Sequence, residues 1–556
     1  MQSKPLVISI CVSAVLAVLP FILIFFSAGG NYPKLPVEVV SDSMYYYSRA
    51  ADIAKGNIFI GNPYIKENKT EVSPAFFVAD WLWAVPLFLG FGIQTSIIIN
   101  QIFWFLIFGI FLYYLFKFFD VKEKYIHWAV SFVILSVYWY LSRPVAMQVI
   151  YPVFLLWLVS FGAYLKNPKS RKNIILLGIA TALSGYIYTY LAQIIFVAFC
   201  IALIASFFPR FKEYRFLWFS ATIAGLLSIP FLLYTWKQVH HPFYFETMAR
   251  IGLVHTNMIG TPAVLYSFLI LLSLLLVYLH RDKFSNAELY LVVSFSLGLI
   301  IATLSNVFTG VDLETALHIG RFTEVWIAVM FIVFFQKVRG GLFWLYAVLA
   351  VSFFLLQIQP WGNIPAVARS HMLSKEPYIE TLNWLKNNTP EESVILADDS
   401  LSGFIPLFTS DYVLFHPHAS LQIDSDMAVQ DRYLSSRILG DLSVQDIKND
   451  MPKYAGNGLS THRYMVYNRN VKVCKLLRFN LFGKNCGEIQ TSASFAGEKY
   501  FTDMKDRYDV FKKTPLSILQ KYNVSYIILD KQNDRWKLPI LLKLEWSNDR
   551  FAIYKL

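Results

Sequence analysis

The sequence has few charged residues for its length. Asp, Glu, Lys and Arg make up 15% of the 556 residues, whereas 56% are hydrophobic and 17% aromatic. A soluble chain of this size cannot bury so much apolar surface, so a polytopic membrane protein is expected. The formal net charge of +12 could indicate nucleic acid binding, but in a membrane protein it more often reflects basic cytoplasmic loops. No nucleic acid partner is expected.

The chain also has few cysteines, and it lacks internal repeats and low-complexity segments. Cys11 and Cys200 fall in apolar runs and are interpreted as packing residues. Cys474 and Cys486 fall in the polar carboxyl-terminal region. In an oxidising compartment this pair could form a disulfide, and a free pair is about equally compatible with the sequence.

Long apolar runs are the dominant pattern of the first two thirds of the chain. Each is close to the length of about 20 residues that crosses a bilayer as a helix. We expect about 11 transmembrane helices, near residues 6–28, 95–116, 126–142, 147–165, 173–189, 190–208, 216–236, 262–280, 285–304, 322–336 and 341–359. The first is expected to be a retained helix and not a cleaved signal peptide, because its apolar core is long and no clear small-residue cleavage site follows.

The basic residues of the loops alternate along the chain. Alternate loops carry Lys117, Lys122, Lys124, Lys166, Lys169, Arg171, Lys172, Arg210, Lys212, Arg215, Arg281, Lys283, Lys337 and Arg339, and the loops between them are poorer in basic residues. The positive-inside rule fits this pattern if the stretch 75–91 does not cross the membrane. Ser73-Pro74 before this stretch is a helix-start signal and Asp80 lies inside it, which favours an interfacial or re-entrant helix. The prediction is a multi-pass plasma or inner membrane protein with a cytoplasmic amino terminus.

The carboxyl-terminal region is polar and mixed, unlike the rest. Its pattern predicts strands at 394–397 and 525–529, each after a helix, and a terminal β-hairpin across Asn548-Asp549. We therefore expect a transmembrane domain over 1–368, with an outer loop and juxtamembrane helices over 29–94, and an extracytoplasmic α/β domain over 369–556.

The first outer loop, 31–74, contains an unusual group of acids. Asp42 precedes a tyrosine cluster, and Glu67 and Glu71 follow an Asn-Pro-Tyr turn. Asp42 could equally be a helix N-cap, with Gly56 ending that helix, and the two roles can coexist. A carboxylate at a helix amino terminus stays ionised, so it is a weak proton acceptor but a good metal ligand or hydroxyl orienter.

Two further outer loops carry candidate residues. Residues 237–261 contain His240, His241, Glu246, Arg250 and His255, without the spacing of a zinc site, and they better suit an anionic head group. In 305–321, a helix would place Glu314, His318 and Arg321 on one face, near Glu324 at the membrane boundary. Arg321 could bind phosphate beside His318, or it could be a snorkelling arginine at a helix end.

These motifs resemble a known superfamily. An Asp42-x-x-Tyr45-Tyr46 helix after the first span, then Asn62-Pro63-Tyr64, an acid and Ser73-Pro74, is similar to the first outer loop of GT-C membrane glycosyltransferases. That superfamily includes protein O-mannosyltransferases, the aminoarabinose transferase of lipid A and oligosaccharyltransferases. The His318-x-Gly320-Arg321-Phe322 motif and an outer tail ending in FAIYKL are also similar to bacterial members.

The resemblance implies an inverting transfer of a hexosyl or pentosyl unit from a polyprenyl-phosphate donor to a glycan, lipid or protein acceptor of the cell envelope. Asp42 would orient or deprotonate the acceptor, with Glu67 as a second catalytic acid. His318, Arg321 and Arg250 would bind the donor phosphate. Glu71, Asp80 and Glu314 would be secondary acids. A divalent metal, Mg²⁺ or Mn²⁺, held by Asp42 and Glu67 is left open, and no other cofactor is implied.

A transporter or flippase for a lipid-linked or anionic substrate is the alternative. Such proteins carry ionisable residues or broken helices near the midplane of several spans. Here the predicted spans hold few charges and the polar residues gather on one face, which favours surface chemistry. A membrane-anchored scaffold would leave the acidic first loop and the His318–Phe322 motif unexplained.

Overall fold

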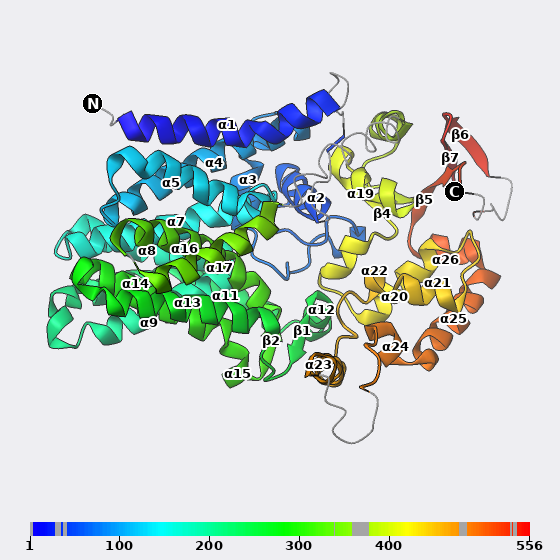
Figure 1. Cartoon of the computed structure of the whole chain (residues 1–556). Coiled ribbons are helices and arrows are strands. Elements are labelled where there is room, and N and C mark those ends of the chain that lie inside the picture. The colour runs from blue at the N-terminus through cyan, green and yellow to red at the C-terminus, as the bar shows by residue number, and fades with distance from the viewer. Residues whose placement is uncertain are drawn as a thin grey trace.

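The computed structural model describes residues 4–27, 35–36, 42–338, 340–358, 377–477, 486–533, 536 and 542–556. A block of apolar helices and a polar carboxyl-terminal tail lie end to end (Figure 1). The predicted domain boundary, 368/369, and residues 31–34 and 37–41 of the first outer loop fall outside the described residues.

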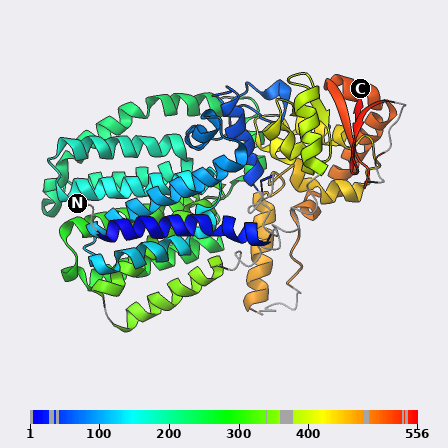
Figure 2. The ribbon, with the colours of Figure 1, turned by 90° about the horizontal axis from the view of Figure 1, so that it is seen from above.

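Each expected span coincides with helical structure. The helices are α1 (Lys4–Ser27), α4 (Ile93–Phe118), α5 (Glu123–Ser136), α7 (Ala146–Lys166), α8 (Arg171–Ile187), α9 (Thr189–Ala205), α10 (Leu217–Leu227) with α11 (Ile229–Val239), α13 (Thr261–Leu279), α14 (Asn286–Thr303), α16 (Thr315–Lys337) and α17 (Gly341–Ile358). Seen from above, they run along a common direction (Figure 2).

The number of 11 spans is not confirmed. Within the described residues, six helices are long and apolar enough to cross a bilayer, namely α1, α4, α7, α13, α14 and α16. The pair formed by residues 209–227 and α11, bent by 48°, would make a seventh. The 14 residues of α5 extend about 21 Å, short of a hydrocarbon core of about 30 Å. The protein is therefore a multi-pass membrane protein whose shorter helices pack between longer ones.

The centre of the helical block is α7, most of whose residues are buried. Aromatic rings fill the space around it: the ring centroids of Trp157 and Phe295 lie 5.9 Å apart, and those of Phe295 and Trp326 4.8 Å apart. At Gly298 of α14 a Cβ atom would come within 2.7 Å of the Cβ of Ala198 on α9. This close approach of two helices through small residues is a usual device in membranes.

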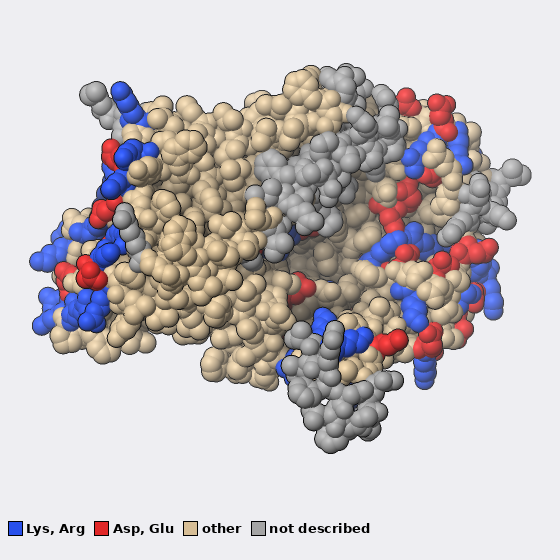
Figure 3. All heavy atoms as spheres, viewed as in Figure 1, with Lys and Arg blue, Asp and Glu red and all other residues tan. Residues whose placement is uncertain are grey.

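Charge divides the surface of the block. Figure 3 shows Lys and Arg side chains gathered at the end that carries the amino terminus, beside a broad band with few charged side chains on that face. Toward the tail the same view shows a hollow with charged side chains in its wall. The block thus has one basic end and one end that meets the tail.

A layer of short elements lies between the helical block and the tail. It contains α2 (Ser43–Ala54), η1 (Lys66–Asn68), α3 (Val78–Phe88), α6 (Tyr138–Leu141), α12 (Tyr244–Ile251), α15 (Ser305–Thr309) and an antiparallel pair, β1 (Leu253–His255) with β2 (Val311–Leu313). The 11 residues of α3 extend about 16 Å, too short to cross a bilayer. The β1–β2 pair joins the second outer loop to the third. The sequence pattern did not predict this strand pairing.

The tail is an α/β unit built on a mixed five-stranded sheet. The strand order is β4 (Tyr412–Val413), β3 (Val394–Leu396), β5 (Val524–Asp530), β7 (Phe551–Lys555), β6 (Lys543–Ser547). β4, β3 and β5 are parallel, and β7 is antiparallel to both of its neighbours, β5 and β6. The two predicted strands correspond to β3 and β5, and the predicted terminal hairpin corresponds to β6 and β7. The helices are residues 377–388, η5 (Pro417–Leu421), α19 (Asp399–Phe408), α20 (Asp426–Ser436), α21 (Val444–Asn449), α22 (Met451–Tyr454), α23 (His462–Leu477), α24 (Ser492–Ala496), α25 (Glu498–Lys513) and α26 (Pro515–Lys521). Two short 3₁₀ helices, η2 (Pro209–Phe216) and η3 (Arg281–Lys283), complete the basic end of the block.

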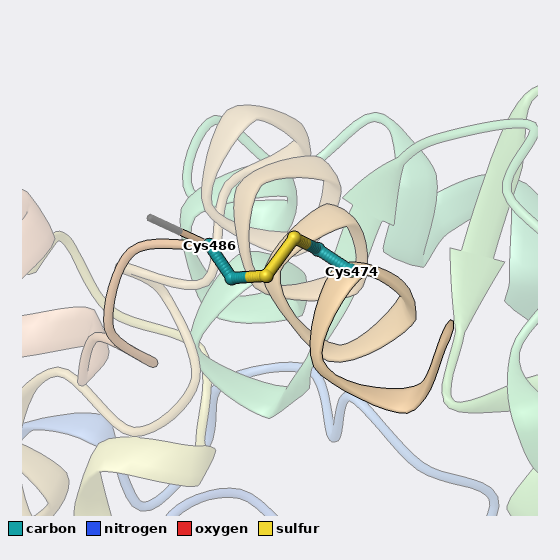
Figure 4. The surroundings of a disulfide bond; sticks show 2 residues. All are labelled: Cys474 and Cys486. Atoms are coloured by element: carbon teal, nitrogen blue, oxygen red, sulfur yellow. A yellow bond between two sulfur atoms is a disulfide. The ribbon is translucent and has the colours of Figure 1, made fainter. Parts of the chain in front are cut away.

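A disulfide joins the two cysteines of the tail. Cys474 on α23 pairs with Cys486, with Cα atoms 5.6 Å apart (Figure 4). Of the two states that the sequence left open, the structure has the bonded one, which suits an oxidising compartment.

Candidate active site

The acid at the head of the first outer loop is used in an ion pair. Asp42 stands at the N-cap position of α2, as expected, but its side chain makes no capping hydrogen bond. Its carboxylate instead accepts from Arg143, whose Nε lies 3.1 Å from Oδ1 and whose second nitrogen binds Oδ2. A bidentate arginine fixes the direction of the carboxylate.

Arg143 connects Asp42 to the third outer loop. It lies between α6 and α7, and its guanidinium is over the ring of Tyr46, 5.5 Å from the centroid. Burial lowers the pKa of Arg143 to about 10, and the nearby positive charge of Arg321 contributes. Arg143 is therefore a cation at neutral pH, and Arg321 lies within electrostatic range of it. Arg143 thus binds Asp42 and also interacts electrostatically with Arg321.

Arg321 is a cation set among tyrosines. Its guanidinium lies over Tyr140, 5.4 Å from the ring centroid, and interacts with the hydroxyl of Tyr188. Its charge also acts on Tyr46 and Tyr151. Within the described part of the chain, no carboxylate lies within 4 Å of Arg321, although most other buried arginines have such a partner. A guanidinium with no carboxylate within hydrogen-bond distance keeps donors available for an anionic ligand.

His318 lies one turn before Arg321 on α16. Its Nδ1 is 2.5 Å from the hydroxyl of Tyr188, and its ring stacks on Tyr190 with centroids 4.3 Å apart. Its Nε2 lies 3.6 Å from Glu314, at the i, i+4 spacing expected. Glu314 itself precedes the helix, at a left-handed φ of 50°. The ring is therefore fixed on both sides next to the arginine.

Asp80 forms a buried ion pair with Arg49. It is 2% exposed and accepts two hydrogen bonds from Arg49 of α2, at 3.1 and 3.0 Å. Arg49 also donates to Ser73, at 3.0 Å. Burial opposes the charged form of Arg49, but Asp80 raises the pKa of Arg49 above its ordinary value. This ion pair joins α2 to α3.

Three other expected site residues contact other parts of the structure. Glu67 pairs with Arg432 of α20 in the tail, at 2.7 Å, and Glu71 lies 3.3 Å from His241. Arg250 is 2% exposed, and its guanidinium donates to the carbonyls of Ser420, Gln422 and Asp424 and to Asp426.

These contacts give Arg250 and Glu67 partners in the tail. The donors of Arg250 bind the tail segment 420–426, and Glu67 pairs with Arg432. The expected roles of Arg250 at the donor phosphate and of Glu67 as a second acid stay predictions.

No cation site is formed by the acids that the sequence suggested. Among the described residues, no group of three or more His, Cys, Asp or Glu side chains is arranged to hold a metal ion. Asp42 has the oxygen ligands that Mg²⁺ or Mn²⁺ prefers, but Arg143 engages them, and Glu67 is engaged by Arg432. Metal dependence therefore stays a prediction, and no chemical step is assigned to a metal.

Comparison with known proteins finds similar structures. No protein-family model and no curated protein matches the sequence. The fold is similar to that of the oligosaccharyltransferase of Archaeoglobus fulgidus. Its apo crystal structure has 12% sequence identity and a TM-score of 0.43, covering 95% of this chain and 70% of that chain. The same enzyme, AglB, in complex with an inhibitory peptide and a dolichol-phosphate, has 12% identity and a TM-score of 0.44, covering 94% and 69%.

Several residues of the cluster could not be assigned from sequence. The only sequence feature that could have indicated Arg143 as a site residue is its position as a lone basic residue in an outer loop. Tyr140, Tyr188 and Tyr190 resemble the many aromatics of a membrane protein, and nothing in their spacing distinguishes them.

The backbone beside Arg143 is strained. Val145, which follows Arg143-Pro144, has φ 57° and ψ −64°, an unfavourable conformation for a β-branched residue.

Proposed function

We propose that this chain is a membrane glycosyltransferase. It transfers a sugar from a polyprenyl-phosphate-linked donor to an acceptor at the extracytoplasmic face. The observation that supports this most is Arg321, a guanidinium without a carboxylate partner in the described structure, placed beside the Asp42–Arg143 pair.

The donor phosphate would bind at Arg321 and His318. Arg321 can hold two phosphate oxygens at once, and the surrounding tyrosine hydroxyls offer further donors. Its place in the first turns of α16, at the end of an apolar helix, matches a ligand whose phosphate is polar and whose tail is a hydrocarbon.

The reaction would be a single displacement at the anomeric carbon. The bond from the acceptor atom to that carbon forms as the bond to the phosphate oxygen breaks, so the configuration inverts. The electron pair of the broken bond stays on the phosphate, where Arg321 and Arg143 stabilise it. The proton of the acceptor passes to Asp42 or to water.

Asp42 would act mainly by orientation. Its carboxylate is held by Arg143 and can serve as a hydrogen-bond acceptor that directs the nucleophile. As a phosphate approaches the two arginines, Arg143 can divide its donors between the phosphate and Asp42. Binding of the donor would then leave Asp42 free to accept a hydrogen bond from the acceptor.

The proposed orientation follows from charge. The loops rich in Lys and Arg and the amino terminus share one end, which we assign to the cytoplasm. The site and the tail then face the outside, where lipid-linked sugars are used.

Asp42→Asn tests the enzyme hypothesis. Transfer from a radiolabelled polyprenyl-phosphate sugar is measured in proteoliposomes against Glu498→Gln, an exposed acid of the tail that contacts Lys448. We expect the rate for Asp42→Asn to fall on the order of a hundredfold, since acid–base and orienting groups contribute about that much. Glu498→Gln should keep the wild-type rate.

Full transfer by a stably folded Asp42→Asn protein would contradict the role of this acid. A wild-type protein that moves the labelled lipid across the bilayer without transferring its sugar would favour the transporter instead.

A further inference from the structure

A cavity lies at the basic end of the helical block, away from the candidate active site. It has a volume of about 330 Å³ and lies between α9, α13 and α14. Its wall includes the apolar side chains of Ile201, Leu274, Val277 and Val293. Two arginines, Arg210 and Arg281, also line it. We call this cavity the basic-end groove.

The two arginines carry charge that no acid neutralises within the described residues. Arg210 is exposed, and its Nε and one terminal nitrogen donate to the neutral side-chain carbonyl of Asn286, at 3.3 and 3.0 Å. Arg281 is exposed, and its guanidinium lies 5.8 Å from the centroid of the Tyr278 ring. Neither lies within 4 Å of a carboxylate in that part of the chain.

The neighbouring acids do not cancel the positive charge of these two arginines. Glu288, at the start of α14, is 2% exposed and pairs with Lys337. The two loops that border the groove, 206–215 and 280–285, hold five basic residues, Arg210, Lys212, Arg215, Arg281 and Lys283, against two acids, Glu213 and Asp282. The rim is therefore net positive, and the wall below it is apolar.

We infer that the basic-end groove binds an anionic phospholipid of the leaflet at this end of the helices. An apolar groove between membrane helices, with two arginines at the level of the head groups, complements a molecule with a phosphate and acyl chains. The inference depends on the membrane embedding of the helices and not on glycosyl transfer.

Lipid retention tests this site. Protein variants are purified in a neutral detergent from vesicles with equal phosphatidylglycerol and phosphatidylcholine, and the lipid that stays bound is counted by native mass spectrometry. The wild type should retain phosphatidylglycerol preferentially. Arg210→Ala with Arg281→Ala should lower this retention on the order of tenfold, since each basic residue near the surface contributes to attraction of anionic lipids.

Two further variants separate a seated lipid from general attraction. Arg171→Ala with Lys172→Ala removes the same charge from exposed residues at the start of α8, outside the groove, and should keep the wild-type retention. Ala205→Trp fills the groove while leaving both arginines, and should lower retention as the double arginine variant does. Excess inorganic phosphate should not displace the lipid.

Equal retention of both lipids by the wild type would overturn the inference. It would also be overturned if the Arg171 and Lys172 variant lost as much lipid as the groove variant, if Ala205→Trp changed nothing, or if inorganic phosphate displaced the lipid. Thermal unfolding of each variant shows whether it is folded. Transfer activity is not a readout, so failure here leaves the proposed function untouched.

Discussion

Two arginines at the outer end of the molecule have opposite electrostatic surroundings. Arg49 is 1% exposed and has Asp80 as a bidentate partner, so its charge is compensated inside the protein. Arg321 is surrounded by tyrosine rings and hydroxyls. A compensated arginine maintains the structure, whereas an uncompensated one can bind an anion.

Removing one partner of the Arg49–Asp80 pair should strongly destabilise the protein. Asp80→Ala leaves a buried guanidinium unpaired, and we expect a loss of about 3–5 kcal/mol in the free energy of unfolding. Replacing both residues, Arg49→Met with Asp80→Leu, should recover most of that loss. Thermal unfolding in detergent measures both variants, and a double variant no more stable than Asp80→Ala would contradict a purely structural pair.

At the scale of elements, α3 should lie on the outer surface and not cross the membrane. In a background with Cys11→Ser and Cys200→Ser, a cysteine at Phe91, after α3, should react with an impermeant maleimide added outside intact cells. A cysteine at Lys122, after α4, should react only after permeabilisation. Both positions are exposed. The opposite labelling pattern would place α3 across the bilayer and reverse the assigned orientation.

The contact between η5 of the tail and α2 should weaken in mild acid. His418 lies beside the rings of Tyr45 and Tyr64, and burial lowers its pKa from 6.5 to about 4. The unfolded chain therefore binds this proton at higher pH than the folded protein, so stability present above pH 6.5 is lost as the pH falls toward 4.

We expect the Tm to fall by several degrees between pH 6.5 and pH 5, before most carboxylates titrate. His418→Gln should flatten this slope, and His240→Gln, at an exposed histidine, should not. An unchanged slope in His418→Gln would assign the acid sensitivity to another group, such as the neighbouring His416.

Sequence patterns predicted elements better than the site. Loop charges along the chain predicted that α3 is not a span, and alternation with a turn signal predicted the β6–β7 hairpin. Neither signal depends on which distant residues come into contact. The Asp42–Arg143 pair joins residues 101 positions apart, and Tyr188 and Tyr190 reach His318 from another helix. No local pattern carries such information. The contacts of Arg250 with the tail segment 420–426 likewise join residues that lie far apart along the chain.

At the scale of the whole molecule, the tail is attached to the helical block through polar contacts of the outer loops. Arg250 is bound by the segment 420–426, Glu67 by Arg432, and Glu314 by Asn457 at 3.1 Å. The ring of Tyr64 stacks on His416 with centroids 4.6 Å apart. The tail thereby adjoins the candidate active site.

Arg250→Met should loosen this attachment without unfolding either part. The variant leaves several carbonyl oxygens and Asp426 without their donor, and buried groups left without a partner cost about 1–3 kcal/mol each. Limited proteolysis should release the tail faster than in the wild type. Glu67→Gln, which removes a more exposed contact, should have a smaller effect. Equal resistance of Arg250→Met and the wild type would show that other contacts hold the tail.

Binding of polyprenyl phosphate to purified protein tests the central claim most directly. The account predicts that Arg321→Gln weakens the affinity about ten- to a hundredfold, the contribution of hydrogen bonds to a charged group. Asp42→Asn should keep the affinity or increase it, because Arg143 is released, and the exposed outer cation Lys237, changed to Gln, should leave it unaltered. Wild-type affinity in Arg321→Gln, or an equal loss in Lys237→Gln, would contradict the assignment of this site to a lipid phosphate.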